Sequence, residues 1–295
     1  MKTNACYADH RKPLIAMISN YSDPERGQIM LFDGFSRTTR IVNDIPYHFC
    51  LGGSGPLLML LHGRPETHAM WHRIAPALSA QHTVICPDLH PERSLSEQAA
   101  DLLSLADSLG HHSLILAGQD YGARVACEVA GQQPSRVKAL ILLEALPGPD
   151  HTGRDDMAFS LTQYESCWFG QLHPKPEANS VQIPAEWLSD PISEDSYFSP
   201  EAVKDYLSAQ VWRSNIPFSW PASRPELQCP VLVLWGKKGR IGGWYNPVAL
   251  WQAVSASTVT GQALPGEHFL PEEVPEETIS AMQNFLAAMS CSDGR

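Results

Sequence analysis

The sequence predicts an α/β fold, in which a mostly parallel sheet is flanked by helices and interrupted by an inserted helical cap. Short apolar segments suited to strands buried on both faces alternate with segments of helical periodicity, and this alternation requires parallel pairing. It stops between Pro147 and Glu226, a proline-containing stretch with four tryptophans and no strand-like alternation. The expected parts are an extension at 1–30, an α/β core at 31–147 and 226–295, and a cap at 148–225.

The N-terminal part of the core predicts a hairpin and then a buried strand. Ser36–Val42 and Pro46–Leu51 flank Asn43-Asp44, a pair typical of a hairpin turn. The glycines and proline of Gly52–Pro56 predict a loop. The apolar run Leu57–Leu61 then predicts a strand buried on both faces. The other candidates for buried strands are Thr83–Cys86, Ser113–Ala117, Ala139–Leu143 and Val231–Trp235.

Helical patterns separate these strands. Ser94-Leu95-Ser96-Glu97 has the spacing of a capping box, and four apolar residues of the following segment share one helix face. Further helices are expected at Ala123–Ala130, Pro247–Val254 and Thr278–Met289. The acidic residues Glu272, Glu273, Glu276 and Glu277 are expected to form a solvated helix start.

Composition excludes several classes of function. The 295 residues include 43% hydrophobic ones, enough for a core, and carry a net charge of −11, which disfavours nucleic acid and anionic membranes as partners. No apolar run is long enough to cross a bilayer, and the N-terminus has no apolar signal core. The seven cysteines form no CxxC motif, so neither a disulfide framework nor a metal site is expected. We therefore expect a cytoplasmic protein.

A sharp turn is predicted where the strand ending at Ala117 runs into Gly118-Gln119-Asp120-Tyr121-Gly122 and directly into a helix. The flanking glycines allow the backbone to lift the central side chain above the sheet, as in a G-x-nucleophile-x-G turn. The helix N-terminus favours an ionised carboxylate at Asp120. The alternative interpretation is that Asp120 merely caps the helix.

Three further features fall where such a turn would need them. His62-Gly63-Arg64-Pro65 follows the first buried strand, and Gly266-Glu267-His268-Phe269 follows the last sheet segment. Glu144 stands one residue past a predicted strand, and no Asp or Glu occurs from Gln228 to Gly266. The order of nucleophile Asp120, acid Glu144 and base His268 is the order found in catalytic triads on such turns.

Three segments carry a resemblance to a known family: His62–Arg73, Gly118–Arg124 and Gly266–Glu273. They resemble the fluoroacetate and haloacetate dehalogenases, in the branch of the α/β-hydrolase fold that also contains epoxide hydrolases. The resemblance runs from about Phe32 to the C-terminus and is weak in the expected cap. It implies the α/β-hydrolase fold, a small-molecule substrate and a homodimer.

The resemblance also implies a reaction. A carboxylate can displace a leaving group from a saturated carbon, which leaves an alkyl ester on Asp120. His268, oriented by Glu144, then activates a water that hydrolyses this ester. The expected oxyanion donors are the backbone N–H groups of Arg64 and Tyr121. This chemistry requires no cofactor or metal.

The predicted substrate is a small molecule, and a carboxylate is favoured. Arg124 matches one of the two arginines that hold the substrate carboxylate in the fluoroacetate enzymes, whereas Tyr121 occupies the position of the other. We expect Arg64 to replace part of the missing contact; the alternative is that Arg64 is an exposed loop residue. Tyr121 remains a candidate substrate contact or acid.

The residues of the expected cap do not decide whether the leaving group is a halide or an epoxide oxygen. Trp168 matches a halide-binding tryptophan of the family, Cys167 stands where a histidine is expected, and Leu207–Trp244 contains no tyrosine. Trp212 could donate its indole N–H, which suits a halide better than an alkoxide; hydrophobic packing is the alternative role for any cap tryptophan. Glu144, in place of the usual aspartate, resembles some epoxide hydrolases instead. The leading hypothesis is a dehalogenase-like hydrolase; the alternatives are an epoxide hydrolase and a non-catalytic ligand-binding homologue.

Overall fold

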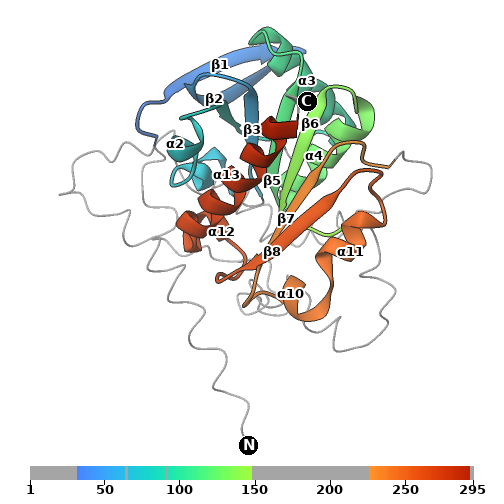
Figure 1. The fold of residues 1–295 in the computed structure, drawn as a ribbon. Helices are drawn as coiled ribbons and strands as arrows, with labels where there is room; N and C mark the ends of the chain where they lie inside the picture. The colour runs from blue at the N-terminus through green and yellow to red at the C-terminus, as the bar shows by residue number, and fades with distance from the viewer. Residues whose placement is uncertain (1–31, 64–65, 91, 148–225, 293–295) are drawn as a thin grey trace, which may run out of the picture.

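The computed structural model describes residues 32–63, 66–90, 92–147 and 226–292. They form one eight-stranded sheet in the order β1-β2-β4-β3-β5-β6-β7-β8. The pairs β1–β2 and β2–β4 are antiparallel, and all the others are parallel (Figure 1). The predicted α/β class is therefore confirmed. The expected extension at 1–30 and the expected cap at 148–225 lie outside the described residues.

The first two strands form the predicted hairpin. β1 (Ser36–Val42) and β2 (Ile45–Gly53) are joined by Asn43 and Asp44, whose φ angles of 49° and 66° are those of the two-residue turn that suits a twisted hairpin. β2 continues through Gly52 and Gly53, which the sequence assigned to a loop. The reason is tertiary, since both glycines pair with β4 in the antiparallel ladder.

The remaining strands form the parallel part of the sheet. β3 (Leu57–Leu61) is buried throughout its length, as its apolar run predicts. Only the first and last residues of β8 are buried, so its sequence lacks the apolar run that reveals the other parallel strands. The other strands are β4 (Thr83–Pro87), β5 (Leu114–Gln119), β6 (Val137–Leu143), β7 (Val231–Gly236) and β8 (Val259–Leu264).

Helices cover both faces of the sheet and form a hydrophobic core on each (Figure 1). One core includes α3 (Leu95–Ser108), α4 (Tyr121–Gln132) and α11 (Pro247–Gln252). The other includes the 3-10 helix η1 (His68–Trp71), α2 (Ala75–Leu78) and α13 (Pro275–Ser292). Two short helices complete the described part, α10 (Arg240–Trp244) and α12 (Leu270–Glu273). None of the described helices is long and apolar enough to cross a membrane.

Helix α3 begins with the predicted capping box. The Ser94 hydroxyl accepts the Glu97 N–H, and the Glu97 carboxylate accepts the Ser94 N–H at 2.9 Å. These two bonds satisfy backbone donors that a helix start would otherwise leave unpaired.

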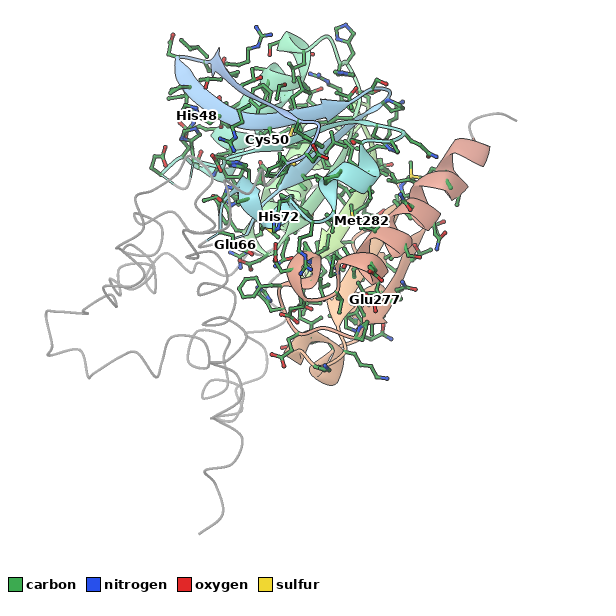
Figure 2. All side chains as sticks on the ribbon, turned by 90° about the vertical axis from the view of Figure 1, so that its left-hand side faces the viewer. His48, Cys50, Glu66, His72, Glu277 and Met282 are labelled. Atoms are coloured by element: carbon green, nitrogen blue, oxygen red, sulfur yellow. The ribbon has the colours of Figure 1, made fainter. Side chains whose placement is uncertain are left out.

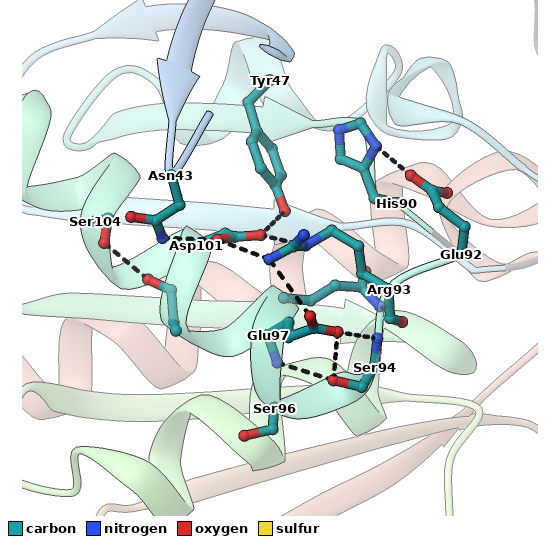
Figure 3. Close-up of polar contacts among 12 residues, drawn as sticks. Asn43, Tyr47, His90, Glu92, Arg93, Ser94, Ser96, Glu97, Asp101 and Ser104 are labelled. Carbon is teal, nitrogen blue, oxygen red and sulfur yellow. Dashed lines mark hydrogen bonds and ion pairs between the residues drawn. The ribbon is translucent and has the colours of Figure 1, made fainter. Parts of the chain in front are cut away.

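A buried polar cluster attaches the hairpin to α3 (Figure 3). Asp101 is 0% exposed and accepts hydrogen bonds from Asn43 at 2.7 Å and from the Tyr47 hydroxyl at 3.1 Å. Arg93, in the segment between β4 and α3, forms an ion pair with the same carboxylate at 2.7 Å. Burial and the neighbouring Asp101 charge raise the pKa of Tyr47, so its hydroxyl stays a donor. The cluster thus joins three separate segments around one buried carboxylate.

Candidate active site

Asp120 lies between the end of β5 and the start of α4, at the edge where the parallel strands end. Its φ and ψ are 46° and −109°, a conformation that residues other than glycine rarely adopt. The Asp120 side chain makes no capping hydrogen bond with α4. The alternative interpretation, that Asp120 merely caps the helix, is therefore wrong. The carboxylate is held on a sharp turn without serving the helix behind it.

The two glycines of this turn are required by close backbone contacts. A Cβ on Gly118 would lie 2.4 Å from backbone atoms of Gly122. A Cβ on Gly122 would lie 2.2 Å from the carbonyl oxygen of Leu61 on β3. The turn can therefore pack against the sheet only with glycine at both positions.

The structure brings the predicted acid and base together. Glu144 follows β6, and its Oε2 lies 3.2 Å from His268 Nδ1 in a buried hydrogen bond. Its other oxygen accepts the N–H of Gly236, at the end of β7, at 2.6 Å. The Glu144 N–H in turn donates to the carbonyl of Leu234. The neighbouring strand thus fixes Glu144 in the position that binds the imidazole.

The electrostatics of this pair favour a charged imidazole. Burial alone would lower the pKa of His268, but the hydrogen bond to Glu144 and the charges of Glu144, Asp120 and Glu273 outweigh it, and the pKa is raised. Burial raises the pKa of Glu144, against the bonds from His268 and Gly236. Because Nδ1 is committed to Glu144, proton transfer with substrate or water falls to Nε2.

Asp120 and Glu144 both have a strained backbone conformation. Among the described residues, four that are not glycine have a positive φ. Asn43 and Asp44 form the hairpin turn, where this conformation is expected. The other two are Asp120 and Glu144, at 46° and 48°. Such outliers concentrate at functional sites, which supports the assignment of both residues to one site.

The segment after β3 lies beside the Asp120 turn, since a Cβ on Gly63 would lie 3.4 Å from Asp120 Cβ. His62 Nε2 accepts the N–H of Leu89 at 2.8 Å, and His62 Nδ1 lies 2.7 Å from the carbonyl oxygen of Gly63. A neutral imidazole satisfies both contacts, with Nδ1 as the donor. Arg64, a predicted oxyanion donor and substrate contact, lies outside the described residues.

The other predicted substrate contacts are placed only in part. The N–H of Tyr121 is at the first position of α4, next to Asp120, as an oxyanion donor requires. The Tyr121 hydroxyl accepts a hydrogen bond from Gln98 of α3 at 2.6 Å. Arg124 is half-buried in the first turn of α4. Trp168 and Trp212 lie outside the described residues, so their roles stay predictions.

Glu66 is a residue to which the sequence analysis gave no role. It is 2% exposed, and neither of its carboxyl oxygens has a hydrogen-bond partner among the residues that the structure describes. A Cβ on Gly63 would lie 2.9 Å from Glu66 Oε2 and 3.4 Å from Asp120 Cβ, so the two acids flank the same glycine. Burial, then the charges of Asp120, Glu272 and Glu273, raise the pKa of Glu66 well above its usual range. Its surroundings thus favour the neutral form of the Glu66 carboxyl beside Asp120.

The acidic residues around α12 do not all form the solvated helix start that their sequence predicts. Glu272 is 5% exposed, and its Oε1 lies 3.1 Å from His72 Nδ1 (Figure 2 labels Glu66 and His72). The Glu273 carboxylate accepts backbone N–H groups of the loop that carries His268. For Glu272 the prediction is wrong, because its side chain is buried next to His72. Glu273 is exposed as predicted, but its carboxylate also binds the loop around His268.

Among the described residues, no group of three or more His, Cys, Asp or Glu side chains is placed to hold a metal ion. The described site offers carboxyl groups, the His268 imidazole and backbone N–H donors.

Comparisons with known proteins point to one family. A family model described as alpha/beta hydrolase fold matches residues 56–186. A fluoroacetate dehalogenase from Burkholderia sp is 26% identical, over 87% of this chain and 95% of that protein. A soluble epoxide hydrolase from Corynebacterium sp. (strain C12) is 25% identical, over 84% of this chain and 96% of that protein.

Solved structures agree with these matches. A protein from Nostoc sp PCC 7120, provisionally assigned as an alpha/beta hydrolase, is 32% identical with a TM-score of 0.64, over 85% of this chain and 98% of that one. A protein from Pseudomonas aeruginosa, provisionally assigned as an epoxide hydrolase, is 28% identical with a TM-score of 0.68, over 88% and 97%.

Proposed function

The chain belongs to the alpha/beta hydrolase family, and we propose that it hydrolyses a bond at a saturated carbon through an alkyl ester on Asp120. The observation that supports this most directly is the placement of Asp120. Its carboxylate stands on the turn where the family presents its nucleophile, it does not cap the helix, and the His268–Glu144 pair lies in the same site. In this proposal His268 is the base and Glu144 orients it.

The first step uses Asp120 as the nucleophile. One carboxylate oxygen attacks the carbon in line with the leaving group, which departs with the electron pair of the broken bond. A carboxylate suits a saturated carbon, because attack on a carbonyl would give only a reactive anhydride. The product of this step is an ester between Asp120 and the substrate carbon.

The second step uses His268 as the base. Its Nε2 takes a proton from water, and the resulting hydroxide adds to the ester carbonyl of Asp120. The oxyanion that forms is stabilised by the N–H of Tyr121 and by that of Arg64, each worth about 3 kcal/mol of barrier. Collapse of this intermediate breaks the bond between the carbonyl carbon and the alkoxy oxygen, which takes the proton and leaves as an alcohol.

The leading candidate substrate is a small halogenated carboxylate. One relative is a fluoroacetate dehalogenase. Arg124 supplies a positive charge in the first turn of α4, one turn from Asp120, where it could hold a carboxylate. A departing halide needs no proton, so this reaction requires no acid.

A specific observation favours an epoxide as the second candidate. The oxygen of an epoxide needs a proton as its bond to carbon breaks. The buried Glu66 carboxyl flanks the same glycine as Asp120, and its raised pKa suits a group that supplies such a proton. Another relative is a soluble epoxide hydrolase.

Intact mass spectrometry of a His268→Gln variant tests the proposal. Without the base, the ester should accumulate on exposure to small haloacids or epoxides, and peptide mapping should place the added mass on Asp120. The mass of the substrate without its halide identifies the first candidate, and the mass of the whole epoxide the second. An Asp120→Asn/His268→Gln variant is the control and should stay unmodified. If neither substrate class modifies His268→Gln or is turned over by the wild type, the proposal is wrong and the non-catalytic alternative is favoured.

A further inference from the structure

We propose that Glu273 is a positioning residue for His268, which holds the loop around the base and thereby supports hydrolysis of the ester. The geometric part of this inference rests on the contacts of the Glu273 carboxylate. Its catalytic consequence rests on the proposed function. Nothing in the sequence pattern distinguishes Glu273 from the other acidic residues that precede α13.

The carboxylate of Glu273 binds three consecutive backbone N–H groups. Its Oε2 accepts the N–H of Glu267 at 2.5 Å. Its Oε1 accepts the N–H of Phe269 at 3.0 Å and, more weakly, that of His268 at 3.3 Å. Successive N–H groups that converge on one anion form a nest, and bonds from N–H groups to a carboxylate are stronger than those to a neutral acceptor. The backbone on both sides of the base is therefore fixed by one side chain.

The helix that carries Glu273 is itself anchored. α12 has only four residues, but three of them are buried. The Glu272 backbone carbonyl accepts a hydrogen bond from Arg73 at 2.7 Å, and the Glu272 carboxyl lies 3.1 Å from His72 Nδ1 at the end of η1. The N–H groups of Glu272 and Glu273 return to the Phe269 carbonyl at 2.9 and 2.8 Å. Glu273 thus holds the loop from an element packed against the core, although its own side chain is exposed.

The negative charge of Glu273 also acts on the pKa of His268. Acidic groups from three elements act on the imidazole: Glu144 after β6, Asp120 after β5, and Glu273 in α12. All three raise the pKa of His268 against the effect of burial. The charge of Glu273 also reaches Glu66 and Glu144. Removal of this charge should therefore make His268 a weaker base as well as loosening its loop.

The two steps of the proposed reaction should respond differently. Asp120 attacks the substrate without help from His268, whereas attack of water on the ester needs the base. Loss of Glu273 should slow ester hydrolysis and leave ester formation largely intact. A residue that only stabilised the fold would affect both steps through the fraction of folded protein.

The experiment compares Glu273→Gln with Glu276→Gln, an exposed acidic residue in the first turn of α13. The glutamine keeps one oxygen that can accept N–H groups but removes the charge and replaces the second acceptor oxygen with an NH2 group. NMR titration of the His268 imidazole should show its pKa lowered in Glu273→Gln and unchanged in the control. In single-turnover reactions, ester hydrolysis should slow about tenfold while ester formation stays within about twofold. Glu273→Ala, with its folding checked by circular dichroism, should slow hydrolysis further.

Two results would overturn the inference: an unchanged titration of His268 in Glu273→Gln, or equal loss of both steps in that variant. A failure of the proposed function gives a different pattern. In that case His268→Gln forms no ester with either substrate class, and the NMR titration, which needs no substrate, still decides whether Glu273 acts on His268.

Discussion

Replacing Glu66 with glutamine should make the folded protein more resistant to rising pH. Within the described part of the chain the buried carboxyl has no hydrogen-bond partner, and burial together with the charges of Asp120, Glu272 and Glu273 raises its pKa well above that of the unfolded chain. Between these two pKa values the folded protein retains a proton that the unfolded chain has released. The free energy of unfolding therefore falls as pH rises through this window.

The magnitude follows from the linkage between proton binding and folding. Each pH unit inside the window lowers the free energy of unfolding by about 1.4 kcal/mol. Above about pH 4.5, the usual pKa of a glutamate, the wild type should lose stability through Glu66 until the pH passes its raised pKa. Glutamine at position 66 has a similar shape, carries no proton to release and leaves a comparable buried polar group, so near pH 5 the two proteins should differ by at most about 1 kcal/mol.

Urea denaturation at a series of pH values measures this difference. The other titrating groups are shared, so their contributions cancel when Glu66→Gln is compared with the wild type at each pH. Glu276→Gln, which removes an exposed carboxylate, serves as the control and should follow the wild type. If Glu66→Gln and the wild type lose stability in parallel from pH 5 to pH 7, Glu66 is not held neutral and the reasoning is refuted.

Two further predictions concern stability. Asp101→Ala leaves Arg93, Tyr47 and Asn43 without their shared acceptor, so thermal denaturation should show the free energy of unfolding lowered by about 3–5 kcal/mol. Removal of Asp107, the exposed partner of Arg136, is the control and should lower it by less than about 1 kcal/mol. Similar losses in the two variants would contradict this account. Burial opposes the charge of His68, but bonds to Asp88 and Cys50 raise its pKa to about 10. The stability that protonated His68 contributes is therefore fully present below about pH 6.5 and is lost as pH rises through 10. In urea denaturation the wild type should therefore lose its extra stability over His68→Gln across this window. A stability difference that stays constant with pH would contradict the His68–Asp88 interaction.

The sequence predicts the site where its signals are local or follow from topology. Asp120 is marked by its pentapeptide between a strand and a helix. Glu144 is marked by its place after a strand and by the absence of Asp and Glu from Gln228 to Gly266. The contact between Glu144 and His268 then follows, because parallel strands end at the same edge of the sheet.

The roles of Glu66 and Glu273 could not be predicted in this way. The environment of Glu66 is made by charges from the β5–α4 turn and from α12, elements far apart in the chain. Glu273 belongs to a run that looks like an ordinary acidic helix start, and only the folded loop directs three N–H groups at its carboxylate. Strand β8 shows the same limit, since its place at the sheet edge removes the apolar pattern that marks the interior strands.

The left-handed backbone at Asp120 and Glu144 has a consequence for the robustness of the molecule. A conformation of this kind costs about 1 kcal/mol or more at each position, and glycine would relieve it. At Asp120, whose side chain does not cap its helix, glycine would relieve this cost without the loss of a capping bond. At Glu144 it would also leave the buried Gly236 N–H and His268 Nδ1 without their acceptor, which opposes the gain. Laboratory evolution toward heat resistance should therefore erode catalysis at Asp120 first.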